Sequence, residues 1–178
     1  MKKLLIPLLL LVSCISSHAQ EPITPIPNLN VARYTGSWYE IAKYPNFFQR
    51  NCASNTVAQY SPQPDGTLRV FNRCAQEDGK VIDATGQARQ IGDANSAKLE
   101  VRFAPAWLSF LPIVWGNYWV IDIDPDYQLV AVSEPKREYL WILSRTPTVS
   151  AKAYDELLVR LRAKSLDTSK LERTRQGG

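Results

Sequence analysis

Hydrophobic and polar residues alternate along most of this chain, in short runs that are separated by turn residues. In segment 97–103, Leu99, Val101 and Phe103 alternate with charged residues. A period of two is typical of a strand that buries one face. Eight such segments follow one another, and they predict strands at 36–44, 54–61, 67–74, 80–91, 97–103, 116–123, 128–133 and 139–144.

The connections between these segments carry the residues that hairpin turns need. Examples are the runs 62–66 and 77–79, which each end in Asp-Gly. Short connections make successive strands antiparallel neighbours, and eight strands joined in this way can close into an up-and-down barrel. The sequence therefore predicts an all-β barrel, and a β-sandwich is the competing architecture.

The periodicity changes near the C-terminus. Tyr154, Leu157, Leu158 and Leu161 fall at helical spacing, and Ser150 is placed to cap the helix. We expect one amphipathic α-helix that packs on the outside of the barrel, followed by a short closing segment at 171–175.

The first residues have the pattern of an export leader, with two lysines, an apolar run and then small residues. Two cleavage sites compete within 1–19. One lies before Cys14, which ends a lipobox-like run and would then carry a lipid anchor; the other follows Ala19. We expect residues 20–27, which contain three prolines, to form an extended tether, and residues 28–176 to form one domain.

Composition and charge restrict the function. Removing Lys2 and Lys3 from the 21 basic residues leaves 19 against 17 acidic ones, too small an excess to argue for a nucleic-acid partner. The single histidine, His18, lies in the leader or the tether and outside the predicted domain, which argues against histidine-based catalysis and the usual zinc sites. A calcium-loop pattern beginning at Asp122 lacks its glycine and its final glutamate. We therefore expect no enzyme, no metal and no cofactor.

Three blocks of the sequence resemble the lipocalins, and specifically the bacterial outer-membrane lipoprotein lipocalins and their animal relative apolipoprotein D. The first is the G-x-W block at 35–42. The second is the Asp-x-x-Tyr run at 124–127 with the apolar residues 129–132, and the third is 139–147 with its single arginine. The resemblance covers about 28–176 and implies an eight-stranded lipocalin barrel.

The resemblance also implies structural roles. Gly36 and Trp38 would close one end of the barrel, with the Arg145 guanidinium stacked on the indole, and Asp124 would form a turn at the same end. Cys52 and Cys74 would share the inward phase of two neighbouring strands. Because two cysteines in an exported chain usually pair, we expect a disulfide between them.

The same phase implies a lining for a ligand that is mostly apolar. The expected lining residues are Thr56, Ala58, Tyr60, Val70, Asn72, Phe103, Tyr139 and Trp141. The resemblance implies binding of a fatty acid or lysophospholipid in the bacterial cell envelope, on a protein anchored to the outer membrane and facing the periplasm. A sterol, haem-like or retinoid ligand, a soluble periplasmic or secreted protein, and a homodimer all remain open.

The connection 104–115 is unusually apolar and has Trp107 and Trp115 near its ends. Such a loop fits a membrane surface, the mouth of the ligand site or a protein partner. An envelope interaction protein that uses this loop is therefore an alternative function. The loop could also simply fold over its own barrel.

Overall fold

The computed structural model describes residues 22–177, so the predicted leader and Cys14 lie outside the described part. The described elements are α1 Val31–Tyr34, β1 Gly36–Lys43, η1 Phe47–Gln49, β2 Ser54–Pro62, β3 Leu68–Ala75, β4 Val81–Gln90, β5 Lys98–Arg102, η2 Ala106–Leu108, η3 Pro112–Val114, β6 Gly116–Ile123, β7 Leu129–Ser133, β8 Leu140–Ser144, α2 Ala151–Ala163, η4 Thr168–Lys170 and β9 Glu172–Arg173. The eight predicted strands are all present, within two residues at each end.

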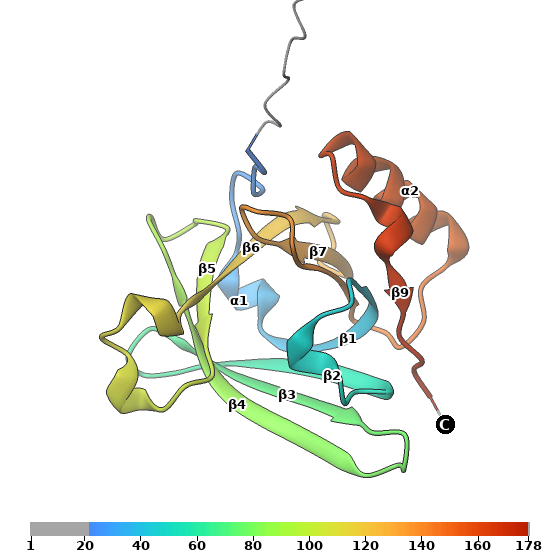
Figure 1. The fold of residues 1–178 in the computed structure, drawn as a ribbon. Helices are drawn as coiled ribbons and strands as arrows, with labels where there is room; N and C mark the ends of the chain where they lie inside the picture. Colours follow the sequence, from blue (N-terminus) through green and yellow to red (C-terminus); the bar gives the residue numbers. More distant parts are fainter. Residues whose placement is uncertain (1–21, 178) are drawn as a thin grey trace, which may run out of the picture.

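The strands form a closed antiparallel barrel (Figure 1). Each strand from β1 to β8 pairs with the next one in sequence, and β1 also pairs with β8, which closes the sheet on itself. The predicted up-and-down barrel is therefore confirmed.

Local chemistry explains where the elements begin and end. The Asp65 carboxylate accepts a hydrogen bond from the Thr67 amide in the β2–β3 turn, and Gly66 has a positive φ of 80° there. Helix α2 begins where the Ser150 hydroxyl accepts from the Ala153 amide, as the sequence predicted.

Two buried layers stabilise the fold. One fills the barrel interior and includes Trp38, Tyr60 and Val70. The other lies between the outer wall and α2, where Leu157 and Leu161 are fully buried. The predicted position of the helix outside the barrel is therefore confirmed (Figure 1).

Residues 22–27 of the predicted extended tether lie against the barrel. Ile23 is only 3% exposed and packs with the layer under α2. The Ile26 amide donates to the Val120 carbonyl of β6 at 2.9 Å. Residues 22–27 form no helix or strand, and the apolar side chains between their prolines hold them on the barrel. Among residues 22–177, no helix is long and apolar enough to cross a bilayer.

The C-terminal segment completes the barrel wall. Strand β1 pairs with β2 only from Gly36 to Tyr39. Beyond that point β9 pairs with β1, and Arg175 bridges to Ser54 of β2. The Gln176 side chain donates to the carbonyls of Glu40 and Thr56, at 2.7 and 2.8 Å. Residues 172–177 therefore lie between β1 and β2, which is more than the short closing segment that the sequence predicted.

Candidate functional site

The closed end of the barrel is held by one arginine. The Arg145 guanidinium carbon lies 3.8 Å from the centre of the Trp38 ring, and Trp38 is completely buried. Arg145 also donates to the carbonyls of Ser37 and Arg33, at 2.9 and 2.6 Å. Gly36 has a φ of +97°, and a Cβ there would lie 3.2 Å from the guanidinium. The structure thus has the cation–π contact that the resemblance implied.

Asp124 organises the turn at the same end. One carboxylate oxygen accepts from the amides of Gln128 and Leu129, at 2.7 and 2.5 Å, and the other accepts from Asp126. These bonds fix the β6–β7 connection beside Arg145, whose amide donates to the Gln128 carbonyl. The part of Asp124 is therefore structural, as expected.

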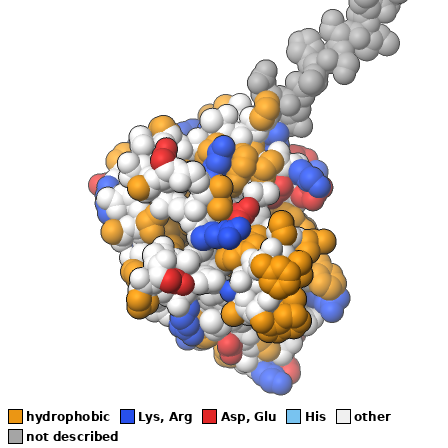
Figure 2. Space-filling view, turned by 90° about the vertical axis from the view of Figure 1, so that its left-hand side faces the viewer, with side chains coloured by type: hydrophobic (Ala, Val, Ile, Leu, Met, Phe, Trp, Pro, Cys, Tyr) orange, Lys and Arg blue, Asp and Glu red, His pale blue; other side chains and the backbone are white. Residues whose placement is uncertain are grey.

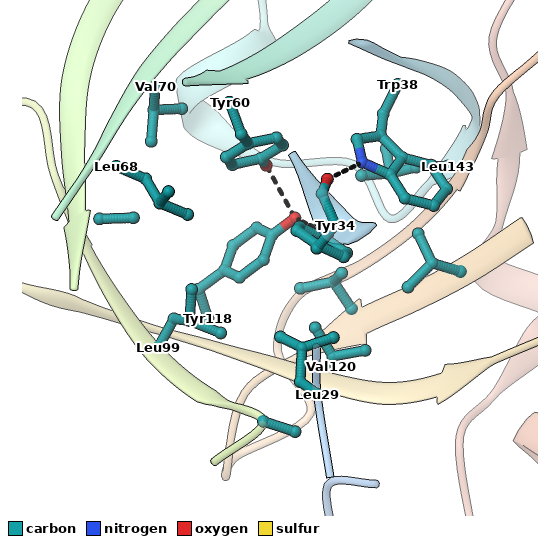
Figure 3. Close-up of a cluster of buried hydrophobic side chains, with 14 residues drawn as sticks. Leu29, Tyr34, Trp38, Tyr60, Leu68, Val70, Leu99, Tyr118, Val120 and Leu143 are labelled. Atoms are coloured by element: carbon teal, nitrogen blue, oxygen red, sulfur yellow. Dashed lines mark hydrogen bonds between the residues drawn. The ribbon is translucent and has the colours of Figure 1, made fainter. Parts of the chain in front are cut away.

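Three tyrosines form the floor of the interior (Figure 3). The Tyr118 hydroxyl lies 2.7 Å from that of Tyr34 and 2.8 Å from that of Tyr60. Burial raises the pKa of all three phenols, and that of Tyr60 to about 12. Tyr34 and Tyr118 were not predicted here, although Tyr118 shares the inward phase of Val120.

Some inward-facing side chains towards the opposite end of the barrel, which we call the mouth, are more exposed than those of the floor. On β3, Leu68 and Val70 are buried and Asn72 is half-buried. On β5, Leu99 is 1% exposed, whereas Phe103, just beyond the strand, is 45% exposed. The floor half is therefore filled with side chains, whereas Asn72, Trp141 and Phe103 towards the mouth stay partly exposed, although Thr56 and Glu40 are buried there.

The predicted lining residues divide between these halves. Tyr60 and Val70 belong to the filled floor, and Ala58 and Trp141 pack against it from above. Thr56 and Asn72 lie on the inward phase of β2 and β3 in the mouth half. Two of the eight thus form the floor and are not free lining.

Aromatic rings line one side of the mouth. Tyr139 and Trp141 are stacked with ring centres 5.6 Å apart. The ring centre of Phe48, from η1, lies 5.7 Å from that of Tyr139. On the other side Phe103 lies against Gly86, where a Cβ would be 2.7 Å from its ring. These partly exposed rings are suited to an apolar ligand.

A polar network holds the connection between β1 and β2, residues 44–53, in place; we call this connection the mouth loop. Glu40 faces inward, is 2% exposed, and accepts from Gln49 of η1 at 2.5 Å and from the Thr174 hydroxyl at 2.6 Å. Gln49 in turn accepts from the Trp141 indole N–H at 2.8 Å. Burial raises the pKa of Glu40, although both hydrogen bonds act in the opposite direction. Sequence reasoning missed Gln49, which carries no motif.

Cys52 and Cys74 form a disulfide, with Cα atoms 5.5 Å apart. Cys52 lies just before β2 and Cys74 near the end of β3, so the bond ties the mouth loop to the wall. The predicted pairing is therefore confirmed. Among residues 22–177, no group of histidine, cysteine or acidic side chains is arranged to hold a metal ion.

Two hollows lie outside the barrel interior. One, of about 370 Å³, adjoins the disulfide and is lined by Arg50, Glu77 and Asp78 among others. The other, of about 630 Å³, lies between the Asp124 turn and α2, where Arg160 pairs with Asp122 at 2.9 Å. Both have charged linings, so neither resembles the expected site for an apolar ligand.

The connection between β5 and β6 presents an apolar surface. Trp107, Phe110 and Ile113 are 73%, 74% and 91% exposed, and we call these three side chains the loop patch. Figure 2, viewed from the side of this connection, shows hydrophobic side chains gathered on that face. The loop therefore does not bury these side chains on its own barrel. The alternative that it simply folds over the barrel is wrong for these three residues.

Comparisons with known proteins agree with the geometry. The chain is 41% identical over 153 residues to temperature-induced lipocalin-1 of Arabidopsis thaliana, covering 85% of this chain and 81% of that protein. It is 36% identical over 170 residues to the outer membrane lipoprotein Blc of Escherichia coli K12, covering 95% and 92%. It is 32% identical over 165 residues to rat apolipoprotein D, covering 89% and 79%.

Solved structures show the same fold. Apocrustacyanin C2 matches with a TM-score of 0.65 at 14% identity, covering 84% of this chain and 81% of that one. Insecticyanin of Manduca sexta matches with a TM-score of 0.65 at 20% identity, covering 85% and 83%. The family model of the lipocalin-like domain matches residues 29–176, and its members are ligand-binding carriers, not enzymes. The chain therefore belongs to the lipocalin family.

Proposed function

We propose that this lipocalin binds the acyl chain of a fatty acid or lysophospholipid in the mouth half of its barrel and carries or stores that lipid in a bacterial cell envelope. The observation that carries the proposal is the change in exposure along the inward faces. Apolar side chains fill the floor, whereas Ala58, Val101 and Trp141 face the interior and stay partly exposed. Burying an acyl chain there would remove apolar surface from water on both partners.

The relatives support the class of ligand and the location. They include an outer membrane lipoprotein and an apolipoprotein. Anchoring through Cys14, a periplasmic orientation and a homodimer are parts of the proposal that rest on the sequence pattern and the resemblance. Mass spectrometry of the mature N-terminus tests the anchor, because a chain that begins at Gln20 would contradict it. Light scattering of the purified protein tests the dimer.

Ligand binding can be tested by fluorescence titration with palmitate and with lysophosphatidylethanolamine. We expect a saturable change in tryptophan emission that a Trp141→Phe variant reduces and a Trp119→Phe variant, on the outer wall, retains. Native mass spectrometry of protein purified from its own envelope would identify a co-purifying lipid. A sterol, haem-like compound or retinoid in that spectrum would replace the proposed ligand. A barrel that ignores every lipid would favour an interaction protein instead.

We also propose that the loop patch contacts a lipid surface. Tryptophan and phenylalanine side chains that are about three-quarters exposed suit the boundary between water and lipid. The unlipidated domain should bind liposomes, and Trp107→Ser with Phe110→Ser should abolish that binding. Val159→Ser on α2, which also removes an exposed apolar side chain, should leave it unchanged. Equal binding by both variants would contradict membrane contact through the patch.

A further inference from the structure

One polar atom in the barrel interior has no partner. The Asn72 Oδ1 atom is buried and accepts no hydrogen bond. Asn72 shares the inward phase of Leu68 and Val70 on β3, and it lies one step nearer the mouth than Val70. Its neighbours across the sheet are Ala58 on β2 and Ala84 on β4. Asn72 is thus a half-buried residue whose amide oxygen is buried and unpaired beside two small side chains in the mouth half of the barrel.

Glu40 and the three tyrosines of the floor, which also face the interior, already have partners. Glu40 accepts from Gln49 and Thr174, and the hydroxyls of the tyrosine floor bond to one another. In the described part of the chain, the other buried side-chain atom without a partner is Arg102 Nε. Arg102 points to the outer face, where it donates to Gln87. Among the buried side-chain atoms of residues 22–177, Asn72 Oδ1 is therefore the one that faces the interior and has unused hydrogen-bonding capacity.

A buried amide oxygen without a partner makes the protein less stable than an apolar side chain of similar size would. Such groups in folded proteins call for a partner outside the protein, either an ordered water or a ligand. An acyl chain alone supplies no partner. A lipid that carries a free hydroxyl or amine at this depth supplies the missing donor, whereas a fatty-acid carboxylate does not donate.

We infer that Asn72 is a specificity-determining residue, and that it selects lipids whose polar group donates a hydrogen bond inside the mouth half of the barrel. The inference rests on the proposed function, because it concerns the same site. Trp141 and Tyr139 then bind the apolar part of the ligand, and the Asn72 amide reads its polar part. A site that hydrogen-bonds a ligand hydroxyl discriminates strongly against the analogue that lacks it.

The test compares two probes that differ in one donor, 1-dodecanol and 1-methoxydodecane, by displacement of a fluorescent acyl probe. The wild-type protein should bind dodecanol about ten-fold more tightly. Asn72→Leu should reduce this preference to less than about two-fold and should raise the melting temperature, because it removes the unpaired amide. Asn72→Asp, which keeps the acceptor, should keep the preference.

Asn117→Leu is the matched control. Asn117 is exposed and faces outward, because it precedes the inward-facing Tyr118 on β6. This variant should keep the wild-type preference for dodecanol over 1-methoxydodecane. Equal binding of both probes by the wild-type protein would overturn the inference and leave the proposed function intact, with water as the partner of Asn72. A preference that survives in Asn72→Leu would also overturn it. Binding of neither probe, nor of palmitate, would overturn the proposed function itself.

Discussion

The tyrosine floor predicts unequal costs for removing its hydroxyls. Tyr118 is the bridge, because its hydroxyl contacts those of both Tyr34 and Tyr60. Tyr118→Phe removes both hydrogen bonds and leaves two buried hydroxyls without a partner. At about 1–3 kcal/mol for each of the two unpaired groups, the variant should lose roughly 2–6 kcal/mol of unfolding free energy. Tyr60→Phe removes one bond and leaves the Tyr34–Tyr118 pair, so it should lose only about 1 kcal/mol.

Urea unfolding followed by tryptophan fluorescence measures these differences, because Trp38 is buried against the same cluster. The triple variant with phenylalanine at 34, 60 and 118 is the control, and it should lie near the wild-type protein because no hydroxyl remains unpaired. A Tyr118→Phe variant that costs no more than Tyr60→Phe would refute the reasoning. It would mean that Tyr34 and Tyr60, whose ring centres are 5.4 Å apart, pair directly once the bridge is removed.

Three further predictions follow from contacts at the two ends of the barrel. Replacing both Cys52 and Cys74 by serine should cost about 3 kcal/mol in urea unfolding, because the bond closes a loop of 22 residues; a loss below about 1 kcal/mol would contradict this. Arg145→Lys should cost about 1–3 kcal/mol, since an ammonium cannot both stack on the indole and reach the Ser37 carbonyl, whereas the exposed Arg73→Lys should be neutral. Because the pKa of Tyr60 is raised to about 12 in the folded state, stability should be fully present below about pH 10 and fall as the pH rises to about 12; tyrosinate absorbance of Tyr60 that appears before unfolding would contradict this.

Local patterns were sufficient for the strands and the helix. Each strand alternates along its own length, and each turn carries its own aspartate, glycine or proline, so the information lies within a few residues. The Trp38–Arg145 contact joins residues at opposite ends of the strand sequence, on β1 and just after β8. Only the resemblance to the lipocalins predicted it. Arg145 faces inward because it continues the alternation of the inward-facing Trp141 and Leu143.

The networks inside the barrel could not be read from local pattern. Glu40 meets Gln49 and Thr174, which lie 9 and 134 positions away along the chain. Nothing in the residues around Gln49 marks it as a bridge to the Trp141 indole. Similarly, the prolines around Ile23 place it in a predicted tether, although its side chain is as apolar as those of the core. Such contacts depend on closure of the barrel, which brings distant segments together.

The position of residues 172–177 between β1 and β2 has a consequence for how the molecule assembles. The first strand of the barrel and the segment that completes its wall beside Glu40 are separated by almost the whole described chain. During synthesis β1 must therefore wait for the C-terminal segment, with its backbone groups beyond Tyr39 unpaired on that side. We expect a late folding step in which this segment docks, and a chain whose translation or export is arrested before residue 172 should expose that unfinished edge to proteases and to other strands.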